Sequence, residues 1–212
     1  ISRVLEKNGF KVCIVAQPQS AADFAEFGCP RLAFFVSSGN IDSMVAHYTA
    51  AKKPRSDDYY TAGGKSGMRP DRAVNVYVKM IKEVFPEIPV AIGGLEASLR
   101  RFAHYDYWDN RVRPSSLIDS GADILMFGMG EHQAVEIAKL LKKGRPVSTI
   151  RDIPGISYKI PENKLKLTDF VECPSFEEVS RTDFEGKKKY AESCRIQQDE
   201  FDAVRGKTVL QK

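Results

Sequence analysis

Residues suited to chemistry concentrate between Val90 and Trp108, in the stretch VAIGGLEASLRRFAHYDYW. The apolar run Val90–Ile92 predicts a buried strand, and the glycine pair after it predicts a turn that exposes backbone N–H groups at the carboxyl end of that strand. A short helix is expected next. The loop that follows holds the aromatic and ionisable residues His104, Tyr105, Asp106, Tyr107, Trp108, Asp109 and Asn110, including the only Trp of the chain. Such a loop could close over a ligand held at the end of the strand.

Two further apolar runs end in small or polar residues. One is Arg31–Val36 and the other is Ile124–Phe127. In doubly wound α/β sheets, ligands bind outside the carboxyl ends of the strands, so the sequence predicts one site formed by three strand ends. The candidate ligand- or cofactor-binding residues are Ser37, Ser38, Gly39, Gly93, Gly94, Glu96, Arg100, Arg101, His104, Tyr105, Trp108, Gly128, Gly130 and Glu131. No residue is assigned a catalytic role.

The candidate site residues also have ordinary structural interpretations. The residues after Val36 fit a plain turn, and Glu131 fits the first turn of a helix, where an acidic side chain is favourable. Arg100 and Arg101 either clamp a phosphate or carboxylate, or one of them pairs with Asp106 or Glu96. Both interpretations remain open on the sequence alone.

The aromatic loop has two interpretations of similar weight. It either closes over a ligand or packs against a neighbouring domain. His104, Asp106 and Asp109 are metal-ligand types, but three such residues in one loop are weak evidence, and no metal site is assigned. Cys13 is expected in the core, and His47 and His132 are expected at the surface.

Apolar periodicity indicates the elements that must position these ends. The ranges 11–16, 31–36, 90–92, 124–127 and 153–160 predict strands, and the ranges 2–10, 21–27, 41–51, 70–84, 96–99 and 131–143 predict helices. Val74, Tyr77, Val78, Ile81 and Val84 form an apolar stripe at helical spacing. The alternation predicts an α/β fold with a doubly wound parallel sheet of Rossmann type, whose first strand is expected upstream of Ile1.

Two regions depart from this alternation. The range 52–68 predicts a long surface loop. Its Gly63–Ser66 tetrad is similar to part of a phosphate-binding loop but lacks the first glycine and the preceding strand, so no phosphate-binding loop is assigned. After residue 150 the chain becomes a charged extension, in which 165–170 is a possible strand. The capping boxes Ser175–Glu178 and Thr182–Glu185 predict a short helix and a longer one ending near Ala203. We therefore expect a Rossmann-like domain over 1–150 and a connector over 151–212.

Composition narrows the class of protein. The 212 residues carry a net charge of +4 and 42% hydrophobic residues, which suffice for a core. The four cysteines, Cys13, Cys29, Cys173 and Cys194, form no CxxC pair, and a reducing cytoplasm is the expected location. No apolar run approaches the ~20 residues of a membrane span, so no membrane partner is expected. Lys and Arg are interleaved with acidic residues, which does not by itself indicate nucleic acid.

Two long segments resemble a known family. They are GGKSGMRPDRAVNVY, over 63–77, and GGLEASLRRFAHYDYWDNRVRPSSLIDSGADILMFGMGE, over 93–131. Both resemble the YgiQ family of radical S-adenosylmethionine (SAM) proteins, and the likeness is expected over the whole chain. The two glycine-rich strand ends resemble the cobalamin-binding-like domains that precede radical SAM domains. Ala62 departs from the family pattern, where Pro is expected.

The resemblance implies the N-terminal domain of a radical SAM enzyme of unknown substrate. A [4Fe-4S] cluster on a CxxxCxxC motif and SAM would be bound downstream of Lys212, not by this chain, and the reduced cluster would cleave SAM to a 5′-deoxyadenosyl radical. This domain would position the substrate or an accessory ligand, with its own downstream radical SAM domain as partner. Cobalamin use stays open, because the loop that holds its DxHxxG motif would lie upstream of Ile1.

Two alternatives belong to other functional classes. One is a non-catalytic protein-interaction module that uses the aromatic loop and the charged tail. The other is an RNA-binding module that uses the basic pairs Lys52–Lys53 and Arg100–Arg101 and the run Lys187–Lys189. Whether these basic groups converge cannot be read from the sequence.

Overall fold

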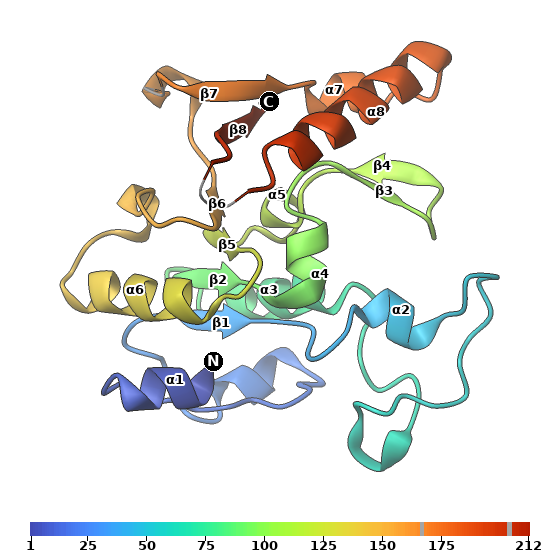
Figure 1. Ribbon diagram of the computed structural model, residues 1–212. Helices are drawn as coiled ribbons and strands as arrows, with labels where there is room; N and C mark the ends of the chain where they lie inside the picture. Colours follow the sequence, from blue (N-terminus) through green and yellow to red (C-terminus); the bar gives the residue numbers. More distant parts are fainter. Residues whose placement is uncertain (166–167, 203–204) are drawn as a thin grey trace. The chain divides into compact units, whose positions relative to one another are not determined.

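The computed structural model describes residues 1–165, 168–202 and 205–212. Contacts divide the chain into two compact units. The first contains Ile1–Arg101 and Ser116–Lys159, and the second contains Phe102–Ser115 and Ile160–Lys212 (Figure 1).

A four-stranded sheet organises the first unit. Its strands are β1 (Phe34–Val36), β2 (Val90–Ile92), β5 (Ile124–Met126) and β6 (Ile156–Tyr158), in the order β1-β2-β5-β6. The first three are parallel, and β6 runs antiparallel to β5. The α/β class and a mainly parallel sheet compatible with a Rossmann-like fold are therefore confirmed. The likeness to cobalamin-binding domains stays a prediction.

The antiparallel β6 corrects the expectation of a wholly parallel sheet. After α6 (Glu131–Lys142) the chain runs back beside that helix, and Ile150 and Ile153 pack in its apolar cluster. The Phe127 N–H donates to the Gly155 carbonyl, so the chain has already returned to the carboxyl end of β5 before β6 begins. A strand that starts there can only run antiparallel.

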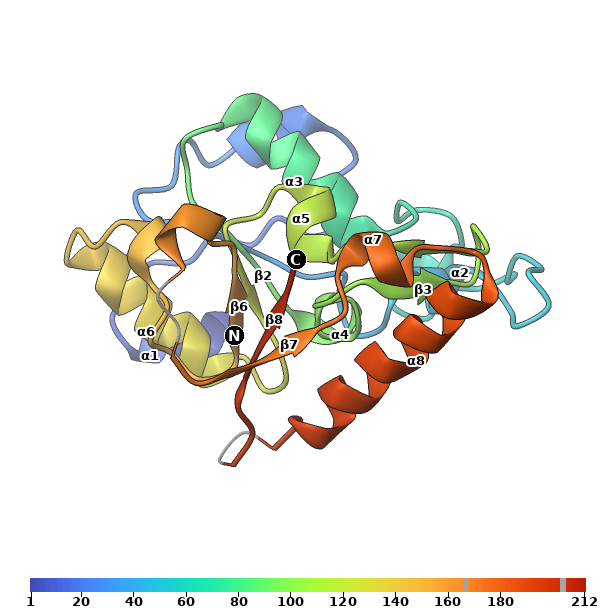
Figure 2. The same cartoon turned by 90° about the horizontal axis from the view of Figure 1, so that it is seen from above.

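The sheet carries helices on both faces. Val90, Ile92 and Leu125 pack in one cluster with α3 (Ala73–Val84), and the alternate residues Ala91, Ile124 and Met126 pack in another with α6. Alternation is expected because successive side chains of a strand point to opposite faces. α1 (Ser2–Lys7) packs on α6 through Leu5, and Figure 2 shows α3 and α6 on opposite sides of the strands. Four residues of the predicted stripe of α3 are buried, and the fifth, Val84, is half-buried at the end of the helix.

The predicted strand over 11–16 is wrong. The segment makes no strand, Ile14 is 67% exposed, and Cys13 is exposed and not in the core. A strand is stabilised by hydrogen bonds to a neighbour, and in the described residues this segment has no strand partner. Its apolar character is used instead by Val12 and Val15, which pack at the edges of two core clusters.

Several helix limits are shorter than periodicity predicts. η1 (Ala21–Ala25) and α2 (Ser43–His47) are shorter than the predicted ranges 21–27 and 41–51, whereas α4 (Gly94–Leu99) begins two residues before the predicted 96–99. The short elements η2 (Ala62–Gly64), α5 (Ser116–Ser120) and η3 (Val147–Thr149) were not predicted as helices. α2 ends because Tyr48 is extended, with φ −130° and ψ 149°. α3 begins three residues after Pro70, because Arg72 at its N-cap adopts the left-handed region at φ 52°.

The second unit contains two small sheets and a helix pair. They are the hairpin of β3 (His104–Asp106) and β4 (Arg111–Arg113), the parallel pair β7 (Phe170–Cys173) and β8 (Thr208–Gln211), η4 (Glu162–Lys164), α7 (Phe176–Val179) and α8 (Phe184–Asp199). The expected aromatic loop is thus a β-hairpin.

The capping predictions for the second unit are confirmed in one case and corrected in the other. Ser175 and Glu178 form the predicted capping box of α7. α8 is capped by Asp183, whose carboxylate accepts from the Gly186 N–H, and not by Thr182. The strand predicted over 165–170 begins only at Phe170, and its residues 166–167, like the expected helix end at 203, lie outside the described residues. In the described ranges, no helix combines the length and apolar character needed to cross a membrane.

Candidate functional site

The ends of the three parallel strands lie side by side at one edge of the sheet. A Cβ on Gly94 would lie 3.2 Å from the Ser37 Cβ, and a Cβ on Gly93 would lie 3.2 Å from the Met126 Cε. The Gly128 N–H donates to the Ser98 hydroxyl of α4 at 3.3 Å. The structure therefore brings the candidates at the ends of β1, β2 and β5 to one edge.

The end of β1 is a tight turn whose polar atoms are used within the fold. The Ser38 hydroxyl donates to the Ile41 carbonyl at 3.0 Å, and the Gly39 N–H donates to the Ser37 hydroxyl at 3.3 Å. The Ser38 carbonyl accepts from Arg69 Nη1 at 2.8 Å. These contacts match the turn interpretation of this segment.

Glu96 is a buried connector between three helix starts. It is 1% exposed, and its Oε2 accepts from the Ser43 N–H at 2.8 Å and the Ser43 hydroxyl at 2.7 Å. Its Oε1 accepts from the Val74 N–H at 3.0 Å. The first turns of α2 and α3 are thereby held to α4 by one carboxylate, because the N–H groups at a helix start have no partner within the helix.

The two arginines of α4 and its following turn are also engaged within the first unit. Arg100 forms an ion pair with Asp42, which caps α2, so its carboxylate partner is neither Asp106 nor Glu96. The Arg101 guanidinium lies over the Phe127 ring, 5.3 Å from its centroid, and donates to the Ser98 carbonyl at 2.9 Å. Burial lowers the pKa of Arg101. Both side chains are therefore already engaged in stabilising the fold.

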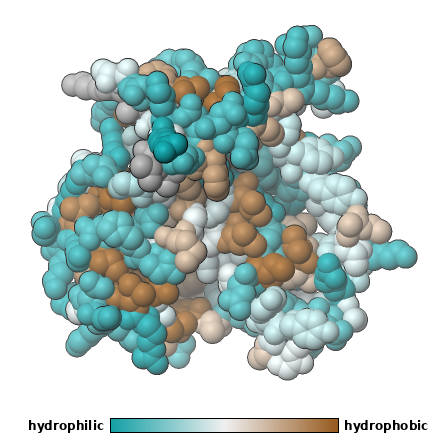
Figure 3. All heavy atoms as spheres, viewed as in Figure 1, coloured by the Kyte–Doolittle hydropathy of each residue, from teal (hydrophilic) through white to brown (hydrophobic). Residues whose placement is uncertain are grey.

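The end of β5 differs from the other two. Gly128 has φ 73° and is exposed, Met129 is 82% exposed, and Gly130 precedes α6 without a capping side chain. Glu131 is exposed, and within the described residues its carboxylate makes no hydrogen bond or ion pair. Apolar surface lies over α4 in Figure 3, where Leu95 and Leu99 are exposed. This strand end is the open part of the edge.

His104, Tyr105 and Trp108 belong to the second unit, whereas the other candidates belong to the first. The Tyr105 N–H donates to the Tyr190 hydroxyl at 2.9 Å, and the His104 Nδ1 lies 3.2 Å from the Phe102 carbonyl. The buried Asp106 accepts from the N–H groups of Trp108 and Asp109, which fixes the tip of the hairpin. The role of these three residues in a site stays a prediction.

A buried ion pair next to the end of β1 escaped the sequence analysis. Asp58 and Arg69 approach to 2.6 Å, with side chains 1% and 5% exposed. Burial by itself would raise the pKa of Asp58, but the hydrogen bonds from Arg69, the Tyr60 N–H and the Thr61 hydroxyl outweigh it and lower that pKa. The pair anchors the loop that was predicted to cross the surface.

Asp71 holds a second set of partners that the sequence did not reveal. It lies 2.7 Å from His47 Nδ1 and accepts from the Tyr48 hydroxyl at 2.8 Å, and this hydrogen bond raises the pKa of Tyr48. His47 is buried, which corrects its expected place at the surface, whereas His132 is exposed as predicted. The sequence signal for both contacts was the charged run Arg69–Arg72 directly before an apolar helix. The partners could not be predicted from it, because Asp58 lies 11 residues before Arg69 and His47 lies 24 residues before Asp71.

The cysteines do not form a ligand set for an iron–sulfur cluster. Cys13, Cys29 and Cys194 are exposed, and the buried Cys173 lies 3.2 Å from the Ser193 hydroxyl. Within the described ranges, no three Cys, His, Asp or Glu residues are placed to hold a metal ion. Since a [4Fe-4S] cluster takes cysteine thiolates as ligands, the residues of this chain do not fit one.

Comparison with known proteins decides the family. Residues 1–212 match the family model described as Radical SAM N-terminal. This chain belongs to the Radical SAM N-terminal family. The predicted resemblance to radical SAM proteins is thereby confirmed over the whole chain.

Relatives of this Radical SAM N-terminal chain are considerably longer than the chain itself. The UPF0313 protein of Clostridium botulinum (strain Okra / Type B1) is 55% identical over 214 residues, which cover 100% of this chain and 32% of that protein. The UPF0313 protein of Clostridium perfringens (strain ATCC 13124) is 51% identical over 214 residues, with the same coverage. The chain thus spans about a third of the length of these relatives. No solved structure matches it.

Proposed function

We propose that this chain is the N-terminal domain of a radical SAM enzyme, and that the end of β5 positions a substrate or an accessory ligand. Family membership supports the first part. The second part rests on one observation: at the end of β5 the glutamate of the following helix, Glu131, is exposed and has no partner within the described residues, whereas Glu96 after β2 is buried and fully bonded. Ligands bind at this edge in open α/β sheets.

The chemistry of the β5 end favours a ligand that donates hydrogen bonds. In the part of the chain that the structure describes, the Glu131 carboxylate in the first turn of α6 has no partner, and it would repel an anionic ligand. A hydroxyl or amine group would be attracted. The exposed side chains of Met129, Leu95 and Leu99 offer apolar surface for the rest of the ligand. The glycine at 128 leaves the backbone accessible because no Cβ covers it.

The iron–sulfur cluster and SAM are proposed for a part of the protein outside these 212 residues. The cysteines present do not make the ligand set, so no step of the reaction is assigned to them. Bound together, a reduced cluster and SAM supply a radical that attacks the substrate. The contribution proposed for this chain is to hold the substrate or accessory ligand in place.

The RNA-binding alternative is weakened by the geometry. Arg100 is paired with Asp42, and Arg101 is stacked on Phe127. One of the basic pairs on which that alternative depended is therefore engaged within the fold.

The test uses the full-length protein, purified without oxygen. We expect about four irons per chain, an absorbance near ~400 nm that bleaches on reduction, and SAM cleavage. A small-molecule cell extract should stimulate the cleavage, and Glu131→Gln should lose that stimulation while keeping the basal rate. Glu136→Gln, on the exposed side of the same helix, is the matched control. Absence of iron and of SAM cleavage would overturn the enzymatic assignment, and a Glu131→Gln variant stimulated like the wild type would overturn the site.

A further inference from the structure

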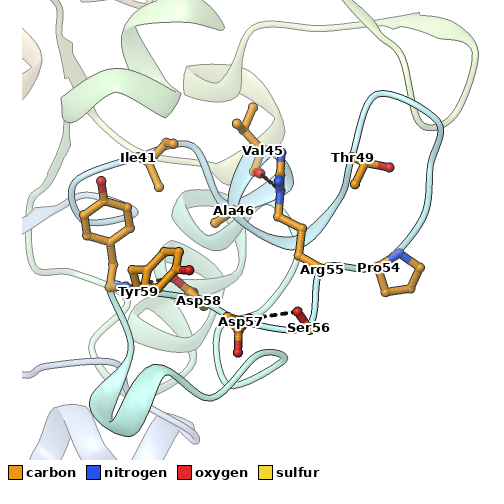
Figure 4. A pocket seen from close by; sticks show the side chains of 11 residues that line it. Ile41, Val45, Ala46, Thr49, Pro54, Arg55, Ser56, Asp57, Asp58 and Tyr59 are labelled. Carbon is orange, nitrogen blue, oxygen red and sulfur yellow. Dashed lines mark hydrogen bonds between the residues drawn. The ribbon is translucent and has the colours of Figure 1, made fainter.

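A cavity of about 630 Å³ lies in the first unit, between α2 and the loop that follows it. Its lining residues come from two short segments, Ile41, Val45, Ala46 and Thr49 from the first and Pro54, Arg55, Ser56, Asp57, Asp58, Tyr59 and Tyr60 from the second (Figure 4). None of them was among the predicted site residues.

Arg55 is held in the cavity by the end of α2. Its Nε donates to the Val45 carbonyl at 3.0 Å and to the Tyr48 carbonyl at 3.2 Å, and Figure 4 shows the side chain reaching across to Val45. Within the described residues, its two terminal nitrogens have no partner. A guanidinium fixed through Nε presents those two nitrogens as a fork that matches the two oxygens of a carboxylate.

Asp57 supplies the opposite charge. In the part of the chain that the structure describes, its carboxylate accepts one hydrogen bond, from the Ser56 hydroxyl at 2.8 Å, and forms no ion pair. The neighbouring Asp58 is neutralised by Arg69 and does not add free charge. Among the described residues, the cavity thus contains one positive and one negative group that have no ion-pair partner, Arg55 and Asp57.

Apolar and aromatic surface completes the lining. Ile41, Val45 and Ala46 form the α2 side, and Tyr59 and Tyr60 are 88% and 55% exposed. Tyrosine side chains combine a flat apolar face with a polar end and are common where small molecules bind. The buried lining residue Asp58 is tied through Arg69 to the Ser38 carbonyl at the end of β1.

We propose that this cavity binds an α-amino acid, free or as part of a small molecule. The carboxylate pairs with Arg55, the ammonium group pairs with Asp57, and an apolar or aromatic side chain lies against the tyrosines and α2. A phosphate is disfavoured, because a second negative charge would approach the carboxylate of Asp57. This assignment does not depend on the function proposed for the end of β5.

The test is calorimetric titration of the full-length protein with L-phenylalanine and L-leucine. Two further probes each carry only one of the two charged groups of phenylalanine: 3-phenylpropionate keeps the carboxylate, and phenethylamine keeps the amine. We expect saturable binding of the amino acids and binding of each half-probe about 10- to 100-fold weaker, since each lacks one charge-assisted pairing. Arg55→Met and Asp57→Asn should each weaken amino-acid binding by a similar factor.

Matched controls are available on the surface. Arg3→Met removes an arginine with a 95% exposed side chain, and Asp169→Asn removes an aspartate with a 74% exposed one. Both should bind like the wild type. Asp57→Asn keeps the shape of the side chain and leaves the backbone bridge between Asp57 and Lys65 in place, so it serves even if loss of Arg55 disturbs α2.

Several results would overturn the proposal. These are no saturable binding of either amino acid at millimolar concentrations, equal binding of 3-phenylpropionate and L-phenylalanine, wild-type binding by Asp57→Asn, or competition by inorganic phosphate. Binding is read without SAM cleavage and can be measured with and without the cluster. A failure here is therefore distinct from a failure of the enzymatic assignment.

Discussion

β2 and β5 both run into a helix through glycine, and both place a glutamate in the first turn of that helix. Glu96 in α4 is 1% exposed and accepts three hydrogen bonds from Ser43 and Val74. Glu131 in α6 is exposed and, within the described residues, has no partner. Two similar local sequences therefore give a structural connector in one place and an open polar group in the other.

The difference comes from what covers each strand end. The starts of α2 and α3 lie against the end of β2, and their unpaired N–H groups are satisfied by the Glu96 carboxylate. Glu131 receives no such donor from the described residues. A glycine turn followed by glutamate thus predicts a position at the sheet edge, but the neighbouring segments decide whether the carboxylate is available to a ligand.

Replacement of the two glutamates should separate their roles most strongly. Glu96→Ala leaves three donors without an acceptor, two of them on the fully buried Ser43, and should lower the free energy of unfolding by about 4 kcal/mol. Glu131→Ala should change it by less than about 0.5 kcal/mol. Urea unfolding followed by far-ultraviolet circular dichroism measures both. If both variants lost the same free energy of unfolding, the difference in burial between Glu96 and Glu131 would not determine their contributions to stability.

Local signals in the sequence were sufficient to predict which strand ends lie at the edge of the sheet. Val90–Ile92 and Ile124–Met126 are short apolar runs with a glycine one or two residues after the last strand residue, so this information lies within a few residues of each strand end. The same kind of signal failed at 11–16, where apolar residues occur but no neighbouring strand provides the hydrogen bonds that make a strand stable.

The buried polar network was beyond the sequence for a different reason. Glu96 bonds Ser43 across 53 residues, and Arg100 pairs with Asp42 across 58. Nothing in one sequence says which of many carboxylates a given arginine will meet. Arg100 was one of two arginines predicted as possible members of an ion pair, but its partner, Asp42, is neither of the two carboxylates considered, Asp106 and Glu96.

The buried ion pair beside the end of β1 should show the next largest effect. Asp58→Asn leaves the Arg69 charge buried and should cost about 3 kcal/mol at neutral pH. Because the pKa of Asp58 is lowered in the folded state, its stabilising effect is present above the unfolded pKa of about 3.9 and is lost as pH falls through the folded value. The difference between wild type and variant should be constant from about pH 7 to 5 and shrink below about pH 4. A difference that persists at acid pH would contradict this account.

Replacing Gly94 and Gly128 by alanine compares the backbone at the ends of β2 and β5. Gly94 and Gly128 have φ 81° and 73°, so either substitution should cost about 1 kcal/mol for the left-handed conformation. At Gly94 the new Cβ also meets the Ser37 Cβ at 3.2 Å, whereas at Gly128 it meets nothing within 4 Å. We expect Gly94→Ala to cost about 1 kcal/mol more than Gly128→Ala in urea unfolding. Equal costs would mean that the end of β1 yields freely to the added methyl group.

The smallest effect is expected at the contact that supports the turn after β5. The Arg101 guanidinium stacks on the ring of Phe127, which directly precedes Gly128. Arg101 also donates a hydrogen bond to the carbonyl of Ser98, and the side-chain hydroxyl of Ser98 accepts one from the Gly128 N–H. Arg101→Lys keeps the charge and loses the planar stacking, which should cost about 0.5–1 kcal/mol. Arg3→Lys, at an exposed pair, should cost nothing measurable in the same urea titration. If Arg101→Lys costs as much as Glu96→Ala, the end of β5 is held as firmly as the end of β2. The exposed Glu131 carboxylate would then lie in a site that is rigid before the ligand binds.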